Sequence, residues 1–236
     1  MLQQIIKDNW LQAKAVMGLW QVEKVKADTI LIKDEQHNTV EQLVFLRQQA
    51  KKAAGEPNYS LADFIAPNQE DYMGAFAVTI DGIEPLLTKF TDAHDDYNKI
   101  LLQSIADRLA EALAEWLHTK VRKEIWGYVP NEAITQAELI KESYQGIRPA
   151  PGYPACPDHT EKLKLFKMLN ATASIGVNLT ESLAMYPVSS VCGWYFSHPQ
   201  SVYFGVGKIQ EDQLSAYAQE KQMLIDELVK WLGPNL

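Results

Sequence analysis

The residues between positions 147 and 158 contain the side chains best suited to chemistry in this sequence. Arg148 carries a planar guanidinium that can bind a carboxylate through two parallel hydrogen bonds. Pro149 and Pro151 fix the backbone φ angle, and Gly152 has no Cβ, so a ligand can lie close to a stiff main chain. Tyr153 adds a flat apolar ring with a polar hydroxyl. Together these residues favour a small, flat, zwitterionic ligand.

A purely structural interpretation of the same stretch remains open. Four of the twelve residues from Ile147 to Asp158 are proline, so no regular hydrogen-bond ladder can pass through them. The segment would then be a simple connection in which Arg148 forms an ion pair with another part of the protein. Asp63 raises a similar question, because it interrupts the apolar run from Ser60 to Pro67. An unpaired buried carboxylate is costly, so Asp63 needs a cationic or hydrogen-bonding partner.

Other motifs are incomplete. Gly205-Val-Gly207 lacks the third glycine and the strand-to-helix turn of a nucleotide-binding loop, so we interpret these glycines as places where another backbone packs closely. The stretch Asp92-Ala-His94-Asp-Asp-Tyr97 is similar to a cobalt-ligating signature, but Tyr97 occupies the position where that signature needs glycine. The remaining histidines have no zinc-ligand spacing. Cys156 and Cys192 are expected to be small buried apolar residues.

Composition narrows the class of protein. The chain has 236 residues with 22 Lys and Arg against 30 Asp and Glu, a formal net charge of −8. This acidity argues against nucleic acid and anionic membranes as partners. We find no apolar run of membrane-spanning length and no secretory signal, and two cysteines are too few for a disulfide framework. We therefore expect a cytoplasmic protein.

The hydrophobic pattern predicts helices and strands without a regular βαβ alternation. Helices are expected over Leu2–Ala15, ended by Gly18, over Glu84–Ile125 with a cap at Asp92 or Asp95, after the capping box Thr135–Glu138, over Asp158–Leu169, and over Glu211–Trp231 with a kink near Met223. Strands are expected over Ala27–Lys33, Thr39–Leu46, Tyr72–Ile80, Leu179–Met185, Val191–Phe196 and Val202–Ile209. This order favours an α+β fold, a single domain with a mainly antiparallel sheet.

The stretch Ile147-Arg-Pro-Ala-Pro-Gly-Tyr-Pro-Ala-Cys-Pro-Asp-His-Thr-Glu-Lys162 resembles the S-adenosylmethionine-binding motif of the activation domain of cobalamin-dependent methionine synthase. Further similar segments follow in the same order: Leu61–Phe64, Gly74–Thr79, His94–Lys99, Ala106–Glu111, Trp126–Tyr128, Tyr144–Gly146, Leu179–Ser182 and Gly193–Pro199. The resemblance is close over 61–236 and looser over 1–60, where the N-terminal part is shortened. It implies one activation domain over 1–236 and a bent antiparallel sheet flanked by helices.

The resemblance also implies a set of ligand-binding residues. Within the motif these are Arg148, Pro149, Ala150, Gly152 and Tyr153, and outside it they are Asp63, Glu111, Glu142, Tyr203 and Phe204. Because position 204 is phenylalanine, any hydroxyl contact there is lost. Arg148 suits the α-carboxylate of S-adenosylmethionine, and the three acids suit its cationic groups, in an assignment that the sequence leaves open. The resemblance implies no catalytic residue and no metal ligand on this chain.

The implied function is reactivation of methionine synthase. In this family the cobalamin, carried by a partner module, oxidises to an inactive cob(II)alamin state. An electron from flavodoxin or a flavoprotein reductase, with a methyl group from S-adenosylmethionine, restores it. The domain itself would only bind and orient the donor. It would not turn over alone, and as a separate chain it would be a split subunit or an excised domain.

Two other functions remain open. One is a non-catalytic S-adenosylmethionine-binding or sensor protein that has no corrinoid partner. The other is an independent methyltransferase, which would need a base near the ligand. The sequence offers no persuasive candidate for that base.

Overall fold

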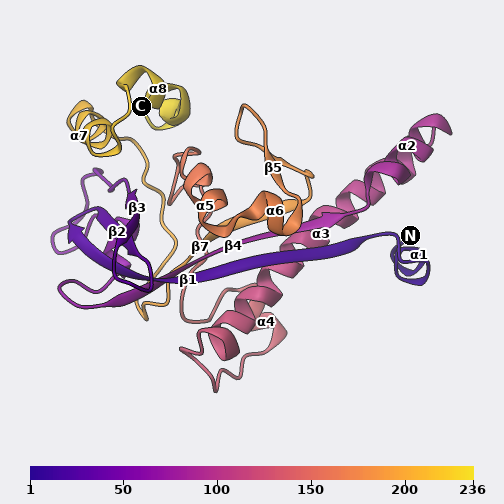
Figure 1. The fold of residues 1–236 in the computed structure, drawn as a ribbon, viewed down its shortest axis with the longest axis horizontal. Helices are drawn as coiled ribbons and strands as arrows, with labels where there is room; N and C mark the ends of the chain where they lie inside the picture. Colours follow the sequence, from indigo (N-terminus) through magenta and orange to yellow (C-terminus); the bar gives the residue numbers. More distant parts are fainter.

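The computed structural model describes every residue from Met1 to Leu236. Its centre is an antiparallel sheet in the order β3-β2-β1-β4-β7 (Figure 1). The strands are β1 (Gln12–Lys26), β2 (Thr29–Lys33), β3 (Thr39–Val44), β4 (Asp71–Asp81) and β7 (Ser190–Tyr195). A separate small sheet pairs β5 (Asn178–Leu179) with β6 (Met185–Tyr186). The α+β class and the mainly antiparallel sheet are therefore confirmed.

Helices cover both faces of the sheet. The helices are α1 (Leu2–Asp8), α2 (Glu84–Asp92), α3 (Asp96–Lys120), α4 (Gln136–Ile140), α5 (Glu161–Leu169), α6 (Ala171–Ile175), α7 (Glu211–Lys221) and α8 (Ile225–Leu232). Two short 3-10 turns span Leu61–Phe64 and Gly233–Asn235, and a π-helical turn, Val121–Ile125, continues α3. None of these helices combines the length and apolarity that crossing a membrane requires.

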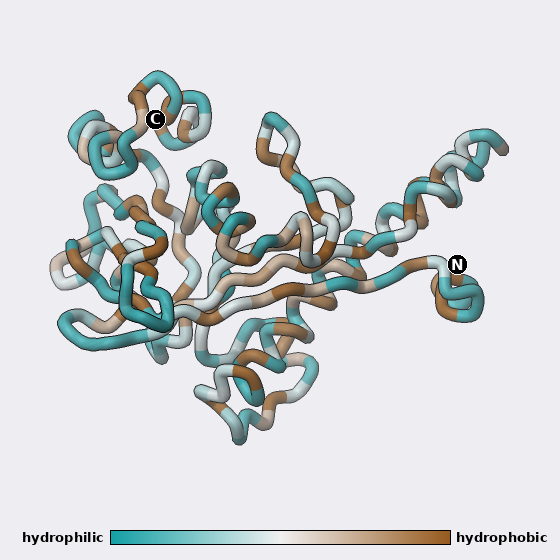
Figure 2. Tube along the Cα trace, in the orientation of Figure 1, coloured by the Kyte–Doolittle hydropathy of each residue, from teal (hydrophilic) through white to brown (hydrophobic).

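Strand β4 shows how the two faces are built, because its side chains alternate between two cores. Met73, Ala75 and Ala77 belong to the largest apolar cluster, which includes the buried residues of α5 and α6. Phe76 and Val78 point the other way and pack with buried residues of α3. The hydropathy trace agrees: brown stretches follow the central strands, while the surrounding loops are mostly hydrophilic (Figure 2). Thus α5 and α6 lie on one face, and α3 lies on the other.

The predicted N-terminal helix over Leu2–Ala15 is wrong in its second half. Helix α1 ends at Asp8, Asn9 adopts a left-handed conformation, and the chain enters β1 at Gln12. Gly18 does not end a helix but lies inside β1, opposite Ala75. A Cβ at Gly18 would lie 2.3 Å from the ring of Trp20, two residues further along the same face. The glycine therefore makes room for the indole within a strand.

The other helix signals agree better with the structure. The Asp95 side chain accepts a hydrogen bond from the Asn98 backbone and caps α3, as predicted. The capping box of Thr135 and Glu138 begins α4. The predicted C-terminal helix with a kink is two helices, α7 and α8, separated where Gln222 takes a left-handed conformation.

The predicted strand over Val202–Ile209 does not form. Residues 201–210 form neither helix nor strand and belong to no sheet. Their backbone makes isolated hydrogen bonds to loops and to the C-terminus: Val206 donates to Pro154 O, and Ile209 donates to Asn235 O. A strand needs a continuous ladder with one partner, which this segment lacks.

Candidate functional site

The proline-rich segment lies along the outer edge of β7. Ile147 and Phe196 exchange two backbone hydrogen bonds of 3.0 Å, and Trp194 donates to the carbonyl of Pro149 at 2.9 Å. The prolines can accept these bonds although they cannot donate. A Cβ at Gly193 would lie 3.0 Å from the Pro149 oxygen, so this glycine permits the close approach.

A cavity of about 620 Å³ opens beside this segment. That volume is in the range of small-molecule sites. Its walls come from β4, α3, the segment after α4, the proline-rich segment, α5, β6, β7 and residues 203–205. The lining residues are Phe76, Glu111, Glu142, Arg148, Pro149, Ala150, Pro151, Tyr153, Pro154, Ala155, Lys162, Met185, Ser190, Val191, Cys192, Tyr203, Phe204 and Gly205. The structure therefore brings together eight of the ten predicted ligand-binding residues.

Arg148 is both an internal ion-pair partner and part of the cavity wall. Its side chain is 14% exposed, and Nη1 lies 2.8 Å from Oε2 of Glu115 on α3. Nη1 also donates to the hydroxyl of Tyr144 and lies 3.4 Å from Nδ1 of His118. Burial alone would lower the pKa of Arg148, but Tyr144 and Glu115 outweigh it and raise the pKa. The ion pair of the structural interpretation therefore forms, and Arg148 also borders the cavity; that it binds a ligand carboxylate stays a prediction.

The two predicted acids at this end of the cavity remain accessible. Glu142 reaches Arg148 Nη2 at 3.8 Å while its side chain stays 43% exposed. Glu111 is an exposed residue of α3. Neither Glu111 nor Glu142 forms a hydrogen-bonded ion pair with a protein cation, so both carboxylates are free to meet a cationic ligand.

Aromatic rings form another wall. The Tyr203 hydroxyl accepts a 3.0 Å hydrogen bond from the Arg148 backbone, which fixes the ring beside the proline-rich segment. The Phe204 ring packs against Tyr59 and Phe64, with centroids 5.8 and 6.3 Å away. Tyr153 is 63% exposed at the cavity. Flat apolar faces of this kind suit a heterocyclic ligand.

Gly152 is not among the residues that line the cavity, and close approach of a ligand to its backbone stays a prediction. Its φ angle is +93°, which strains any residue with a side chain. A Cβ there would also lie 2.4 Å from Cε1 of His159. The glycine is required by the turn and by the histidine ring packed against it.

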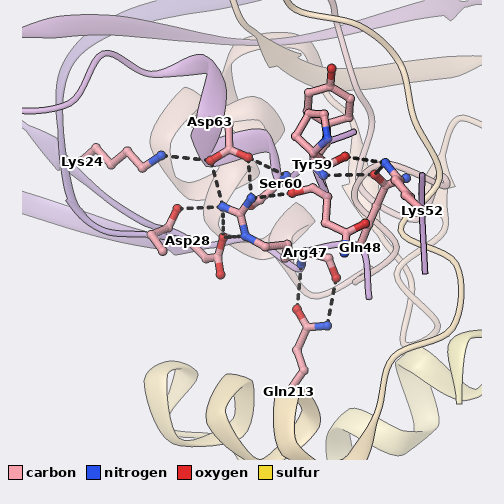
Figure 3. Close-up of polar contacts among 12 residues, drawn as sticks. Lys24, Asp28, Arg47, Gln48, Lys52, Tyr59, Ser60, Asp63 and Gln213 are labelled. Carbon is pink, nitrogen blue, oxygen red and sulfur yellow. Dashed lines mark hydrogen bonds and ion pairs between the residues drawn. The ribbon is translucent and has the colours of Figure 1, made fainter. Parts of the chain in front are cut away.

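Asp63 also lies outside the cavity wall. Its carboxylate receives two hydrogen bonds from Arg47, at 2.6 and 2.8 Å, and one from Lys24 at 3.1 Å (Figure 3). It also accepts from the backbone of Ser60. Burial alone would raise the pKa of Asp63. The hydrogen bonds from Arg47, Ser60 and Lys24 lower it by more than burial raises it, so the pKa lies below its usual value. Its neighbours are protein cations, and direct ligand contact by Asp63 stays a prediction.

Lys162 is a cavity residue that sequence reasoning missed. It is 8% exposed, and its ammonium donates to Leu183 O at 2.9 Å and lies 3.1 Å from His159 Nδ1. No carboxylate lies within ion-pair distance, and burial lowers its pKa. Lys162 is the last residue of the stretch that resembles the binding motif, but it was not selected as a site residue, since most lysines in helices face solvent.

The cysteines are buried as predicted. Burial raises the pKa of Cys192 to about 12, so its thiol stays protonated at neutral pH although it borders the cavity. This leaves the cavity without an activated cysteine nucleophile.

Comparison with known proteins identifies the family. Residues 1–222 match the family described as "Vitamin B12 dependent methionine synthase, activation domain". The chain is also similar to a crystal structure of the MetH reactivation domain bound to AdoHcy, with a TM-score of 0.95 and 49% sequence identity. That match covers 100% of this chain and 74% of the other. The resemblance first seen around Arg148 is confirmed: this chain belongs to the family of activation domains of vitamin B12-dependent methionine synthase.

Proposed function

We propose that the cavity beside β7 binds S-adenosylmethionine and presents its methyl group to a corrinoid carried by another module. The observation that carries the proposal is the pairing of Arg148 with two accessible acids, Glu111 and Glu142, in one cavity. S-adenosylmethionine has a carboxylate, an ammonium and a sulfonium at one end. AdoHcy, which the similar MetH domain binds, differs from it by the methyl group.

The chain's residues supply binding and orientation in this proposal. Arg148 holds the carboxylate, the acids attract the ammonium and sulfonium, and the rings of Tyr203 and Phe204 pack against the adenosine. The reduced corrinoid, when docked, supplies the nucleophile that accepts the methyl group. No general base is needed, because no proton leaves the nucleophile. Catalysis by this chain is therefore catalysis by positioning.

Calorimetry with Arg148→Ala tests the binding half of the proposal. We expect the variant to bind S-adenosylmethionine about 2–5 kcal/mol more weakly, because it loses a charge-assisted contact. Lys89→Ala, which removes an exposed cation from α2, is the matched control and should keep wild-type affinity. Equal affinity of wild type and Arg148→Ala would remove Arg148 from the site.

A reconstituted transfer assay tests the chemical half. The protein is mixed with a cobalamin-binding methionine synthase module, a reductant such as reduced flavodoxin, and methyl-labelled S-adenosylmethionine. We expect label on the cobalamin only when all components are present. Tight donor binding without transfer would instead favour the sensor function.

A further inference from the structure

The hydrogen-bond acceptors around the Arg148 guanidinium gather at one of its three nitrogens, Nη1. Three acceptors surround Nη1: Oε2 of Glu115 at 2.8 Å, the Tyr144 hydroxyl, and Nδ1 of His118 at 3.4 Å. Nη1 has only two hydrogens, so the protein saturates it. Nε and Nη2 donate no hydrogen bond within the chain, and Nη2 lies 3.8 Å from the carboxylate of Glu142. One edge of the guanidinium is therefore held, and the other is free.

Glu115 is the centre of the group that holds it. The Tyr144 hydroxyl donates to Oε2 of Glu115 at 3.2 Å while accepting from Arg148, so the three groups form a closed triangle. The other oxygen, Oε1, is buried without a hydrogen-bond partner and lies 3.7 Å from Nη1 of Arg122. Arg122 is fully buried, and Glu132 neutralises it through Nε and Nη2. Glu115 thus bridges two arginines.

The aromatic neighbours fix this arrangement. The Arg122 guanidinium lies 3.9 Å from the centroid of the Tyr144 ring, and His118 packs edge-on against the same ring. Burial and the two nearby arginines, Arg122 and Arg148, hold the pKa of His118 well below its usual value. The imidazole is therefore neutral, and Nδ1 can accept from Arg148 without adding a third positive charge.

We propose that Glu115 is a positioning residue for the ligand's carboxylate. It clamps Nη1 of Arg148 so that the Nε–Nη2 edge faces the cavity, where it can bind a carboxylate through two hydrogen bonds. Glu115 is not part of the cavity lining and acts only through Arg148. This inference rests on the proposed binding of S-adenosylmethionine.

The test compares two ligands on the same variants. S-adenosylmethionine has the carboxylate, whereas 5′-methylthioadenosine keeps the adenosine and the S-methyl group, on a neutral thioether in place of the sulfonium, and lacks the whole amino-acid end. Glu115→Gln should weaken S-adenosylmethionine binding about tenfold or more, because it removes the negative charge that holds Nη1 of Arg148. The same substitution should leave the affinity for methylthioadenosine within about twofold of the wild-type value. Tyr144→Phe, a milder change to the same triangle, should shift the ratio of the two affinities in the same direction.

Glu124→Gln is the matched control, because this acid near the end of the same helical segment is exposed and pairs only with Lys120. It should not change either affinity. Equal weakening of both ligands by Glu115→Gln and Tyr144→Phe would reduce Glu115 to a structural role and overturn the inference. Unchanged affinities would do the same. If the wild-type protein binds neither ligand, the proposed function fails as well. If Arg148→Ala loses affinity for S-adenosylmethionine while Glu115→Gln and Tyr144→Phe keep it, only the role of Glu115 is overturned.

Discussion

Arg148 and Glu115 illustrate how a residue can serve the interior and the cavity together. The sequence motif identifies Arg148, because proline and glycine neighbours mark an unusual backbone. Nothing in the sequence points from Arg148 to Glu115, which lies 33 positions earlier in an ordinary amphipathic helix. Only the packing of α3 against the sheet brings the two groups to 2.8 Å. The motif around Arg148 was therefore predictable from the sequence, whereas the contact of Glu115 with Arg148 was not.

Asp63 shows the opposite case. Its burial within an apolar run correctly indicated a need for partners, but the sequence could not say which cation would supply them. Arg47, Lys24 and the Ser60 backbone meet it because β1, the segment after β3 and the short turn at Leu61–Phe64 converge (Figure 3). Pairing between distant segments depends on tertiary contacts, which no local pattern encodes.

Gly152→Ala tests the explanation given for this glycine. We expect the free energy of unfolding to fall by roughly 1–3 kcal/mol, because alanine would be strained at φ +93° and would press on His159. Urea denaturation measures the change. Gly233→Ala is the control, since its Cβ would meet open space and its φ is −44°. Equal stability of the two variants would contradict the explanation.

At the scale of elements, a buried ion cluster attaches α7 to the start of α5. The Lys221 side chain is 2% exposed and contacts Asp158 and, at 2.6 Å, Oε1 of Glu161, both of which are equally buried. Lys221 also donates to Thr160 Oγ1 at 2.6 Å. Lys164 also lies 3.2 Å from Oε1 of Glu161, so two acids and two ammonium groups neutralise one another between segments far apart in the sequence.

Lys221→Met should lower the free energy of unfolding by about 3–5 kcal/mol, because buried Asp158 would lose its only cation and buried Glu161 one of its two. Amide hydrogen exchange should quicken first in α7 and α8, since β1 and β4 do not depend on the cluster. Lys230→Met, which changes an exposed lysine of α8, should leave both measurements unchanged. Uniform exchange across the molecule in Lys221→Met would argue against a local attachment.

The same cluster predicts a dependence on pH. Burial raises the pKa of Asp158, but Lys221 and Thr160 outweigh burial, and the net pKa lies below 3.8. Its stabilising contribution is therefore present above about pH 4 and is lost as pH falls through the lower folded pKa. The pKa of Lys221 is raised, so its contribution is lost only as pH rises through that folded pKa. In urea unfolding, the stability gap between wild type and Lys221→Met should narrow on acidification below pH 4, and a constant gap would contradict this assignment.

Two elements show the limits of periodicity. The apolar residues of Leu2–Ala15 fit a helical repeat, yet the second half of this range pairs with β4, because Ala13 to Val22 continue a long ladder there. Val202–Ile209 is rich in β-branched and aromatic residues, as a strand would be, yet it pairs with no strand. Local pattern predicts a conformation, whereas sheet membership depends on a neighbour.

Across the whole molecule, the C-terminal helices support the cavity indirectly. Leu228 of α8 is fully buried in an apolar cluster with Val206 and Ile209. Asn235 donates to Gly207 O at 2.8 Å and accepts from the Ile209 backbone. These contacts hold the unpaired segment that carries Tyr203 and Phe204, so cavity shape depends on residues that never touch a ligand.

Leu228→Ala should lower the free energy of unfolding by about 2–5 kcal/mol, because it leaves a void in this cluster. It should also weaken S-adenosylmethionine binding, because the segment bearing Tyr203 and Phe204 loses its support. Leu224→Ala, at a position 71% exposed, should change neither. Denaturation and calorimetry on both variants check the prediction. Full ligand affinity in a clearly destabilised Leu228→Ala protein would separate α8 from the cavity.

The position of the proline-rich segment on β7 has one more consequence, for association between molecules. An edge strand exposes backbone groups that can recruit a strand from another chain and so begin aggregation. Here Ile147 and the carbonyl of Pro149 already occupy that edge. Pro149 and Pro151 have no N–H to offer a further strand. The segment that borders the cavity therefore also protects the β7 edge of the sheet from pairing with another chain.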